Sequence, residues 1–127
     1  MTVLVIAEHE DGAINGATLA AVAAAQQLGA DIHMLVAGND CAAASEAAAK
    51  VAGISTVRVA DDAAYAHPMA ESMADLVVSL AGDYSHVFAA HTTVGRNILP
   101  RAAALLDVAP IADIQGVVDA DTFERPI

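Results

Sequence analysis

Tryptophan is absent from this 127-residue sequence, cysteine occurs once, and aromatic side chains make up only 3% of the residues. A core without large rings must pack through small side chains, and the abundant alanines suit helices that lie close against a sheet. Because Cys41 is alone, an internal disulfide among these residues is excluded, which fits a reducing compartment. We interpret Cys41 as a small buried side chain, since the sequence offers it no catalytic partner.

Basic side chains are also scarce, with five Lys and Arg against sixteen Asp and Glu and a net charge of -11. No basic stripe could neutralise the phosphates of a nucleic acid, and the acidity disfavours anionic membrane surfaces. The longest apolar runs, such as residues 3–7, are too short to cross a bilayer. The first residues resemble no signal or transit segment, so we expect a bacterial cytoplasmic protein that neither binds nucleic acid nor inserts into a membrane.

Apolar runs with β propensity alternate with longer segments of helical period. With 57% hydrophobic residues the chain can bury a core, and by its length we expect one domain, residues 1–127. The near-continuous apolarity of the short runs indicates parallel strands buried on both faces. The expected strands are residues 3–7, 32–37, 56–60, 86–90 and 111–118. The expected helices are at about residues 16–28, 40–52, 68–81 and 94–106.

The last two helices have the clearest apolar stripes, and we expect both stripes to face the sheet. The stripes consist of Met69, Met73, Leu76, Val77 and Leu80 in one helix, and Ile98, Leu99, Ala102, Leu105 and Leu106 in the other.

Local signals for helix ends agree with these boundaries. Gly29 and Gly53 end helices, Asp40 can cap one, and Pro68 suits a first helical turn. The alternating order of strands and helices implies right-handed crossovers. The predicted class is therefore α/β, a three-layer, doubly wound and mostly parallel sheet with helices on both faces.

In such a sheet, ligands meet the carboxyl ends of strands where the strand order switches. The loops to search are "AEHEDGAING" and "AHTTVGRN", after the first and fourth expected strands. In the second loop, Thr92 or Thr93 can cap the following helix, Gly95 allows a close approach, and Arg96 places a charge beside exposed N–H groups. With Asn97, these residues are the candidate anion or inter-domain contact.

The strongest signatures of a phosphate loop are missing. Neither G-x-x-x-x-G-K-[ST] nor G-x-G-x-x-G occurs, so an ordinary capped helix start is the favoured interpretation of "TTVGRN". In addition, Glu8, Glu10 and Asp11 in the first loop would repel phosphates that approach the same edge of the sheet.

Histidines at the same edge raise the question of a metal site. His9 and His91 would lie on neighbouring strand ends if the first and fourth strands pair. Because no H-x-x-x-H spacing or cysteine cluster accompanies them, exposed loop histidines are the favoured interpretation, and we assign no metal ligand. The other histidines, none with an evident catalytic partner, are His33, His67 and His86.

Two further acids, Asp61 and Asp62, follow the third expected strand and are interpreted as structural, because acids there commonly satisfy backbone donors. G-x-S-x-G is absent and no nucleophile has a base in view, so no catalytic residue is assigned.

The whole chain resembles the N-terminal domain of electron transfer flavoprotein alpha subunits. The similar stretches are "VLVIAEH", "ATLAAVAAAQQLG", "LVAG", "AAAKVAGISTVRVADDAAYAH", "YSHVFAAHTTVGRNILPRAAALLDVAPIADI" and "DTFERPI". The most specific parts are "VADDAAYAH", "TTVGRNILPRAAALLDVAP" and "DTFERPI" in that order. His91 stands where we expect a smaller or Pro-like residue, whereas Arg96 keeps the positive charge usual in the family.

The resemblance implies a nucleotide-hydrolase-like Rossmann variant within an electron carrier made of alpha and beta subunits. FAD would be held mainly by a C-terminal domain of alpha, so none is expected in residues 1–127, and the last residues look like the point at which a longer chain was cut. The flavin would accept electrons from dehydrogenases, including acyl-CoA dehydrogenases of fatty acid beta-oxidation, and pass them to a membrane-associated quinone oxidoreductase. The beta subunit resembles this domain and binds AMP in a comparable place, whereas the alpha N-terminal domain is not known as a nucleotide site.

We therefore expect a scaffold and subunit-contact domain, not an enzyme. Two alternatives remain at this point. One is a free-standing nucleotide or small-molecule binding α/β domain that uses His9, Thr93, Gly95 and Arg96. The other is an assembly module without any ligand.

Overall fold

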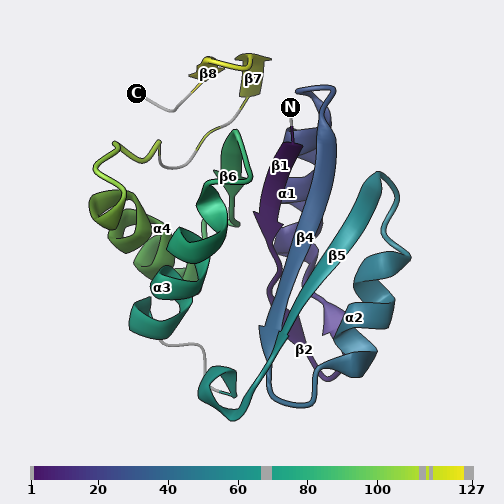
Figure 1. The fold of residues 1–127 in the computed structure, drawn as a ribbon. Coiled ribbons are helices and arrows are strands. Elements are labelled where there is room, and N and C mark those ends of the chain that lie inside the picture. The colour runs from purple at the N-terminus through teal and green to yellow at the C-terminus, as the bar shows by residue number, and fades with distance from the viewer. Residues whose placement is uncertain (1, 67–69, 112–113, 115, 125–127) are drawn as a thin grey trace.

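The computed structural model describes residues 2–66, 70–111, 114 and 116–124 (Figure 1). Its main sheet has four parallel strands in the order β5-β4-β1-β6. Their bounds are Thr2–Ile6 for β1, Asp31–Gly38 for β4, Ile54–Asp61 for β5 and His86–Phe88 for β6. The chain therefore builds outward from β1 to β5, and then crosses back to place β6 on the other side of β1. The strand order switches between β1 and β6.

Helices cover both faces of this sheet, which confirms the three-layer α/β class. On one face lie α1 (Gly16–Gln26) and α2 (Ala42–Ala49), and on the other lie α3 (Ala70–Ala81) and α4 (Thr93–Leu105). Figure 1 shows α3 and α4 side by side across the sheet from α2.

The side chains of strand β1 are buried on both faces of the sheet. Val3 and Val5 pack with α1 and α2, whereas Leu4 and Ile6 pack with α3 and α4, and all four are at most 3% exposed. Successive side chains of a strand point to opposite faces, so a strand buried on both sides must be apolar throughout. Alanines on the helices, such as Ala25, let the layers approach closely.

The stripe of α3 faces the sheet as predicted, and that of α4 does so in part. Met73, Val77, Ile98 and Ala102 are buried in the core between these helices and the sheet, with Leu76, Leu80 and Leu99 packed against it. Leu105 and Leu106, however, are exposed, so the prediction that they face the sheet is wrong. Ala102 in the last turn is still buried with Ile98, whereas Leu105 is the last residue of α4 and Leu106 is its C-cap, so both lie at the very end of the helix. Met69 lies outside the described residues.

Two predicted helix ends are confirmed and one cap is wrong. Gly29 and Gly53 have φ of +69° and +91°, which only glycine adopts without strain. Asp40 also has a positive φ, and it does not cap α2; the N-cap position is Cys41, which makes no side-chain capping bond. Pro68 lies outside the described residues.

The fifth predicted strand, residues 111–118, is described only in part, and no described residue of this range joins the parallel sheet. The strand found there is β7 (Gly116–Asp119), which pairs antiparallel with β8 (Thr122–Glu124). Residues 112, 113, 115 and 125–127 lie outside the described part of the chain. Phe123 of this hairpin lies 6.4 Å from Phe88 between ring centroids, and the hairpin thereby rests near β6.

Among the described residues, no helix combines the length and the apolarity that a bilayer crossing requires.

Candidate functional site

The carboxyl ends of β1 and β6 form the edge where a ligand of a doubly wound sheet would sit. The loop after β1 carries Glu8, and the loop after β6 carries Thr92. These two side chains meet, because the Thr92 hydroxyl donates a hydrogen bond to a Glu8 carboxylate oxygen. The acidic loop and the start of α4 are therefore in direct contact.

Glu8 is fixed in this place by its own backbone. Its N–H donates to the hydroxyl of Thr18 on α1 at 2.8 Å, and its carbonyl accepts from the N–H of Asn15 at 2.8 Å. Thr18 is fully buried, and Asn15 caps α1 through the N–H of Ala17 at 2.9 Å. The position of the Glu8 side chain thus follows from the way α1 begins.

Of the two predicted candidates, Thr92 and Thr93, Thr92 is the N-cap of α4. Its hydroxyl oxygen accepts from the N–H of Gly95 at 3.2 Å, while its hydroxyl hydrogen goes to Glu8. A carboxylate next to a helix N-terminus is electrostatically favourable, since the unpaired N–H groups carry a partial positive charge. Glu8 therefore supplies from within the chain the negative charge that a bound anion would otherwise bring.

Gly95 does permit a close approach, but the approaching atom belongs to the chain itself. A Cβ at this position would lie 2.0 Å from the carbonyl oxygen of Ala90. The first turn of α4 is therefore packed against the end of β6, and the packing alone requires a glycine. Thr93, Arg96 and Asn97 are exposed on the outer side of this turn.

The geometry at the switch in strand order does not fit the pyrophosphate of FAD or the phosphate of AMP. The cap of α4 already donates to a carboxylate, the glycine faces its own backbone, and Glu10 and Asp11 add further negative charge on the same loop. A phosphate would have to displace Glu8 against this repulsion. At this edge of the described structure, the start of α4 is therefore not open to a phosphate.

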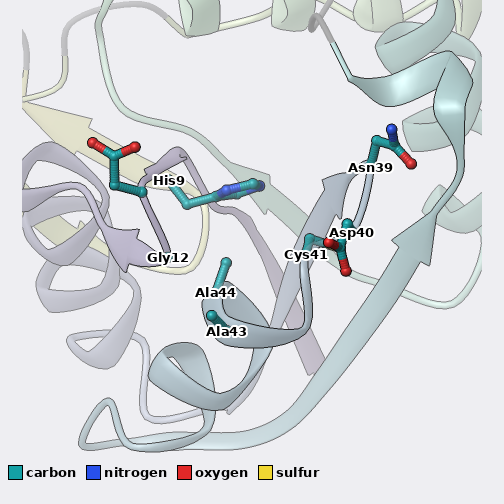
Figure 2. Close-up of a pocket in the computed structure, with 8 residues that line it drawn as sticks. His9, Gly12, Asn39, Asp40, Cys41, Ala43 and Ala44 are labelled. Carbon is teal, nitrogen blue, oxygen red and sulfur yellow. The ribbon is translucent and has the colours of Figure 1, made fainter.

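A cavity of about 240 Å³ lies beside this edge, between the loop after β1 and the loop after β4. Its lining residues are His9, Asp11, Gly12, Asn39, Asp40, Cys41, Ala43 and Ala44. Figure 2 shows His9 on one side of the cavity, facing Asp40 and Cys41 at the start of α2.

Two polar side chains at or near this cavity, those of His9 and Asp61, are engaged with the backbone. The Nε2 of His9 donates to the carbonyl oxygen of Ala37 at 2.9 Å. The carboxylate of Asp61, at the end of β5, accepts from the N–H of Asp40 at 2.7 Å and from that of Cys41 at 3.4 Å. Asp61 thus holds the turn that leads into α2, just before the helix begins. Asp62 likewise caps the short helix η1 (Ala63–Tyr65) through the N–H of Ala64 at 2.9 Å.

Cys41 is 4% exposed, in accord with its interpretation as a buried side chain. Burial first, and the negative charge of Asp61 second, raise the pKa of its thiol. A thiol that retains its proton is a poor nucleophile and a poor metal ligand.

No cluster of three or more potential metal ligands occurs within the described residues. His9 and His91 follow neighbouring strands as expected, since β1 and β6 pair, but His9 bonds to Ala37 and His91 is exposed.

The remaining histidines have partners that the sequence did not reveal. His33 on β4 bonds through Nδ1 to the hydroxyl of Tyr84 at 2.8 Å, and Arg58 donates to the same hydroxyl at 3.2 Å. His86 donates through Nε2 to the carbonyl oxygen of Ala120 at 2.6 Å and so ties the hairpin to β6. His67 lies outside the described residues.

Sequence reasoning missed one element at this edge, the two-stranded hairpin of β2 (His9–Glu10) and β3 (Ala13–Ile14). Its turn consists of Asp11 and Gly12, with φ of +52° and +77°. Asp-Gly is the preferred pair for a two-residue hairpin turn, so the signal was present in "EDGA".

Comparison with known proteins gives a consistent result over the whole chain. A family model described as "Electron transfer flavoprotein domain" matches residues 3–127. An electron transfer flavoprotein subunit alpha of Pseudomonas aeruginosa is 58% identical over 127 residues, and one of Paracoccus denitrificans is 53% identical over 128 residues. A mitochondrial subunit alpha of Oryza sativa subsp. indica is 43% identical over 135 residues.

Each of these alignments covers 100% of the chain, but only 41%, 41% and 38% of the three relatives, respectively. The chain thus spans less than half the length of the curated relatives it matches.

Proposed function

The chain belongs to the electron transfer flavoprotein family, and from this membership we propose that it acts as the N-terminal scaffold and subunit-contact domain of an alpha subunit. The observation that carries the proposal is the 58% identity over the full chain to a protein named subunit alpha, of which the match takes up 41%. At this level of identity the fold and the assembly are expected to be shared. In this proposal residues 1–127 form one domain and a flavin domain belongs to the rest of the polypeptide.

FAD is held outside residues 1–127 in this proposal. The start of α4 supports this part of the proposal, because a phosphate does not fit there. Glu8 occupies the place of the phosphate, and Gly95 is packed against the carbonyl oxygen of Ala90. The chain then acts as part of an electron carrier and not as an enzyme, while groups around the flavin ring set its potential.

The complete protein would pair this alpha chain with a beta subunit. It would carry electrons from dehydrogenases, such as the acyl-CoA dehydrogenases of fatty acid beta-oxidation, to a quinone oxidoreductase of the respiratory chain. The two bacterial relatives favour a location in the bacterial cytoplasm over an organelle.

Thr92, Thr93, Gly95, Arg96 and Asn97 are proposed as an inter-domain contact and not as an anion site. Thr93, Arg96 and Asn97 are exposed at the start of α4 and free to touch a neighbouring domain, whereas Thr92 and Gly95 serve the helix itself.

Co-expression of the complete alpha chain with the beta subunit tests the proposal. We expect the two chains to purify together as a yellow complex with the absorption bands of oxidised flavin near one FAD per pair. A colourless protein, or an alpha chain that binds no second subunit, would refute it.

A further inference from the structure

Asn15 and Gly16 form an asparagine–glycine pair at the start of α1. The other two asparagines of the sequence, Asn39 and Asn97, are followed by an aspartate and an isoleucine. An asparagine loses its side-chain amide when the backbone nitrogen of the next residue attacks its Cγ atom. A glycine in that position hinders the attack least, because it has no Cβ and its backbone turns easily.

The attacking atom would be the backbone nitrogen of Gly16. Gly16 is the first residue of α1, and the first N–H groups of a helix have no acceptor within the helix itself. No atom from elsewhere in the described structure lies within 4 Å of the position that a Cβ of Gly16 would occupy. Both Asn15 and Gly16 are exposed in residues 1–127. The nitrogen is therefore neither engaged by the helix nor crowded by a neighbouring element.

The atom under attack, Cγ of Asn15, is polarised by the helix. The side-chain oxygen Oδ1 accepts a hydrogen bond from the N–H of Ala17 at 2.9 Å. Attack on Cγ moves negative charge onto this oxygen. A donor already directed at the oxygen, beside the partial positive charge of a helix N-terminus, stabilises that charge. The bond that caps α1 thus also favours the attack.

The folded backbone of Asn15 restrains the reaction. Asn15 is extended, with ψ of 141°, and its carbonyl oxygen accepts from the N–H of Thr18 at 3.0 Å. The peptide plane between Asn15 and Gly16 must turn before the nitrogen reaches Cγ, and this turn breaks the bond from Thr18. The reaction therefore passes through an opened first turn of α1, and helix ends open more readily than a core does.

We propose that Asn15 is a site of spontaneous deamidation. The nitrogen of Gly16 gives its proton to water or hydroxide and bonds to Cγ, and the side-chain nitrogen of Asn15 leaves as ammonia. The product is a five-membered succinimide ring. One water molecule then opens the ring at either carbonyl, which gives aspartate or isoaspartate at position 15. The inference does not rest on the proposed function, because the reaction needs only these two residues and water.

The two products affect the fold differently. Aspartate caps a helix about as well as asparagine does. In isoaspartate the backbone runs through the side-chain carbon and is one atom longer. The N–H of Asn15 donates to the carbonyl of Glu8 at 2.8 Å, and the longer backbone puts this bond and the cap of α1 out of register. The isoaspartate form should therefore loosen the loop that brings Glu8 to Thr92.

The test uses the complete polypeptide, incubated in its folded state at pH 7 and at pH 9 and then digested. Mass spectrometry follows the amide of each asparagine, and an isoaspartate methyltransferase identifies the iso product. We expect Asn15 to lose its amide at least about ten times faster than Asn39 or Asn97. The loss should be faster at pH 9, because the deprotonated nitrogen is the attacking form.

Gly16→Ala is the matched variant, since its Cβ hinders the attack and meets no described neighbour within 4 Å. It should slow the loss at Asn15 at least about tenfold and leave the rate at Asn97 unchanged. Asn15→Asp reproduces the aspartate product and should keep the melting temperature, whereas the fraction that contains isoaspartate should melt lower.

Loss at Asn15 no faster than at Asn39 and Asn97 would overturn the inference, and so would an equal rate at Asn15 in the Gly16→Ala variant. An isoaspartate fraction that melts at the same temperature as Asn15→Asp would overturn the effect assigned to the loop of Glu8.

Discussion

The hydroxyl of Thr92 donates to the carboxylate of Glu8, and this contact joins the loops after β6 and β1 across the switch in strand order. The residues are 84 positions apart in the sequence. Together they place the chain's own negative charge at the start of α4, where a nucleotide of a related fold would place a phosphate. The proposed role of residues 1–127 as a support without a cofactor depends on this contact.

Thr92→Ala should destabilise the chain by about 1 kcal/mol, the usual effect of removing an N-cap hydroxyl. Both the bond from the N–H of Gly95 and the bond to Glu8 are lost. Urea denaturation followed by circular dichroism measures the change, and Thr92→Ser, which keeps the hydroxyl, should behave as the unaltered chain. Equal stability of the alanine and serine variants would contradict the assigned cap.

Gly95→Ala should be far more harmful than a glycine-to-alanine change elsewhere. The new Cβ would lie 2.0 Å from the carbonyl oxygen of Ala90, and a backbone atom cannot turn aside as a flexible side chain can. We expect a loss of roughly 2 kcal/mol or more. Gly16→Ala is the matched control, because nothing lies within 4 Å of its Cβ position at the start of α1. A Gly95→Ala variant as stable as Gly16→Ala in the same denaturation experiment would show that this packing is wrong.

Asp61→Ala should loosen the beginning of α2. The carboxylate accepts from the N–H groups of Asp40 and Cys41, and α2 has no side-chain cap of its own. The expected cost is about 1 kcal/mol, with faster amide hydrogen exchange at Asp40 and Cys41, whose N–H groups lose their acceptor. Glu46→Ala, an exposed acid within α2, controls for the loss of charge. Unchanged exchange at Cys41 in Asp61→Ala would contradict the role of Asp61.

Cys41 should be unreactive until the chain unfolds. It is 4% exposed, and burial together with the charge of Asp61 raises the pKa of its thiol. A thiol reagent at pH 8 should label it at least tenfold more slowly in the folded chain than in urea, a rough bound for a buried thiol. Equal labelling rates in the two states would show that the side chain is accessible.

The same thiol gives a pH dependence with a definite sign. Because folding raises its pKa, the folded chain keeps the proton where the unfolded chain loses it. The resulting stabilisation is fully present below the ordinary cysteine value of about 8.5 and is lost as the pH rises through the raised value. Cys41→Ala should therefore lose less stability between pH 8 and 10 than the unaltered chain, measured by urea denaturation at each pH.

The sequence was sufficient to predict the layers of the fold and several of the helix ends. The apolar runs of β1 and β4 predict strands buried on both faces, and Thr92 and Gly29 mark helix ends as expected. These features depend on neighbours within a few residues, which is the range over which a sequence pattern carries information.

The wrong predictions concern features that depend on contacts between residues far apart in the sequence. Residues 111–118 are apolar enough for a strand, yet apolarity cannot distinguish a parallel neighbour from the antiparallel partner β8. The apolar stripe of α4 continues in the sequence to Leu106, although the buried residues of this helix end at Ala103. Asp40 has the right side chain for a cap, but its own N–H donates to Asp61, 21 residues away, and the N-cap position is Cys41. The sequence predicted that Glu8 and Thr92 lie at the same edge of the sheet and that Glu8 would repel a phosphate there. It did not predict that the two side chains are in contact.

Residues 1–127 are proposed to support a redox group that other residues hold. Calorimetric titration of this chain, shown to be folded by circular dichroism, with FAD, AMP and ATP tests it most directly, beside an absorption spectrum of the complete alpha and beta pair. We predict a yellow complex and no heat of binding from residues 1–127 at micromolar concentrations. Retention of about one flavin or nucleotide per folded chain of residues 1–127 would contradict the account.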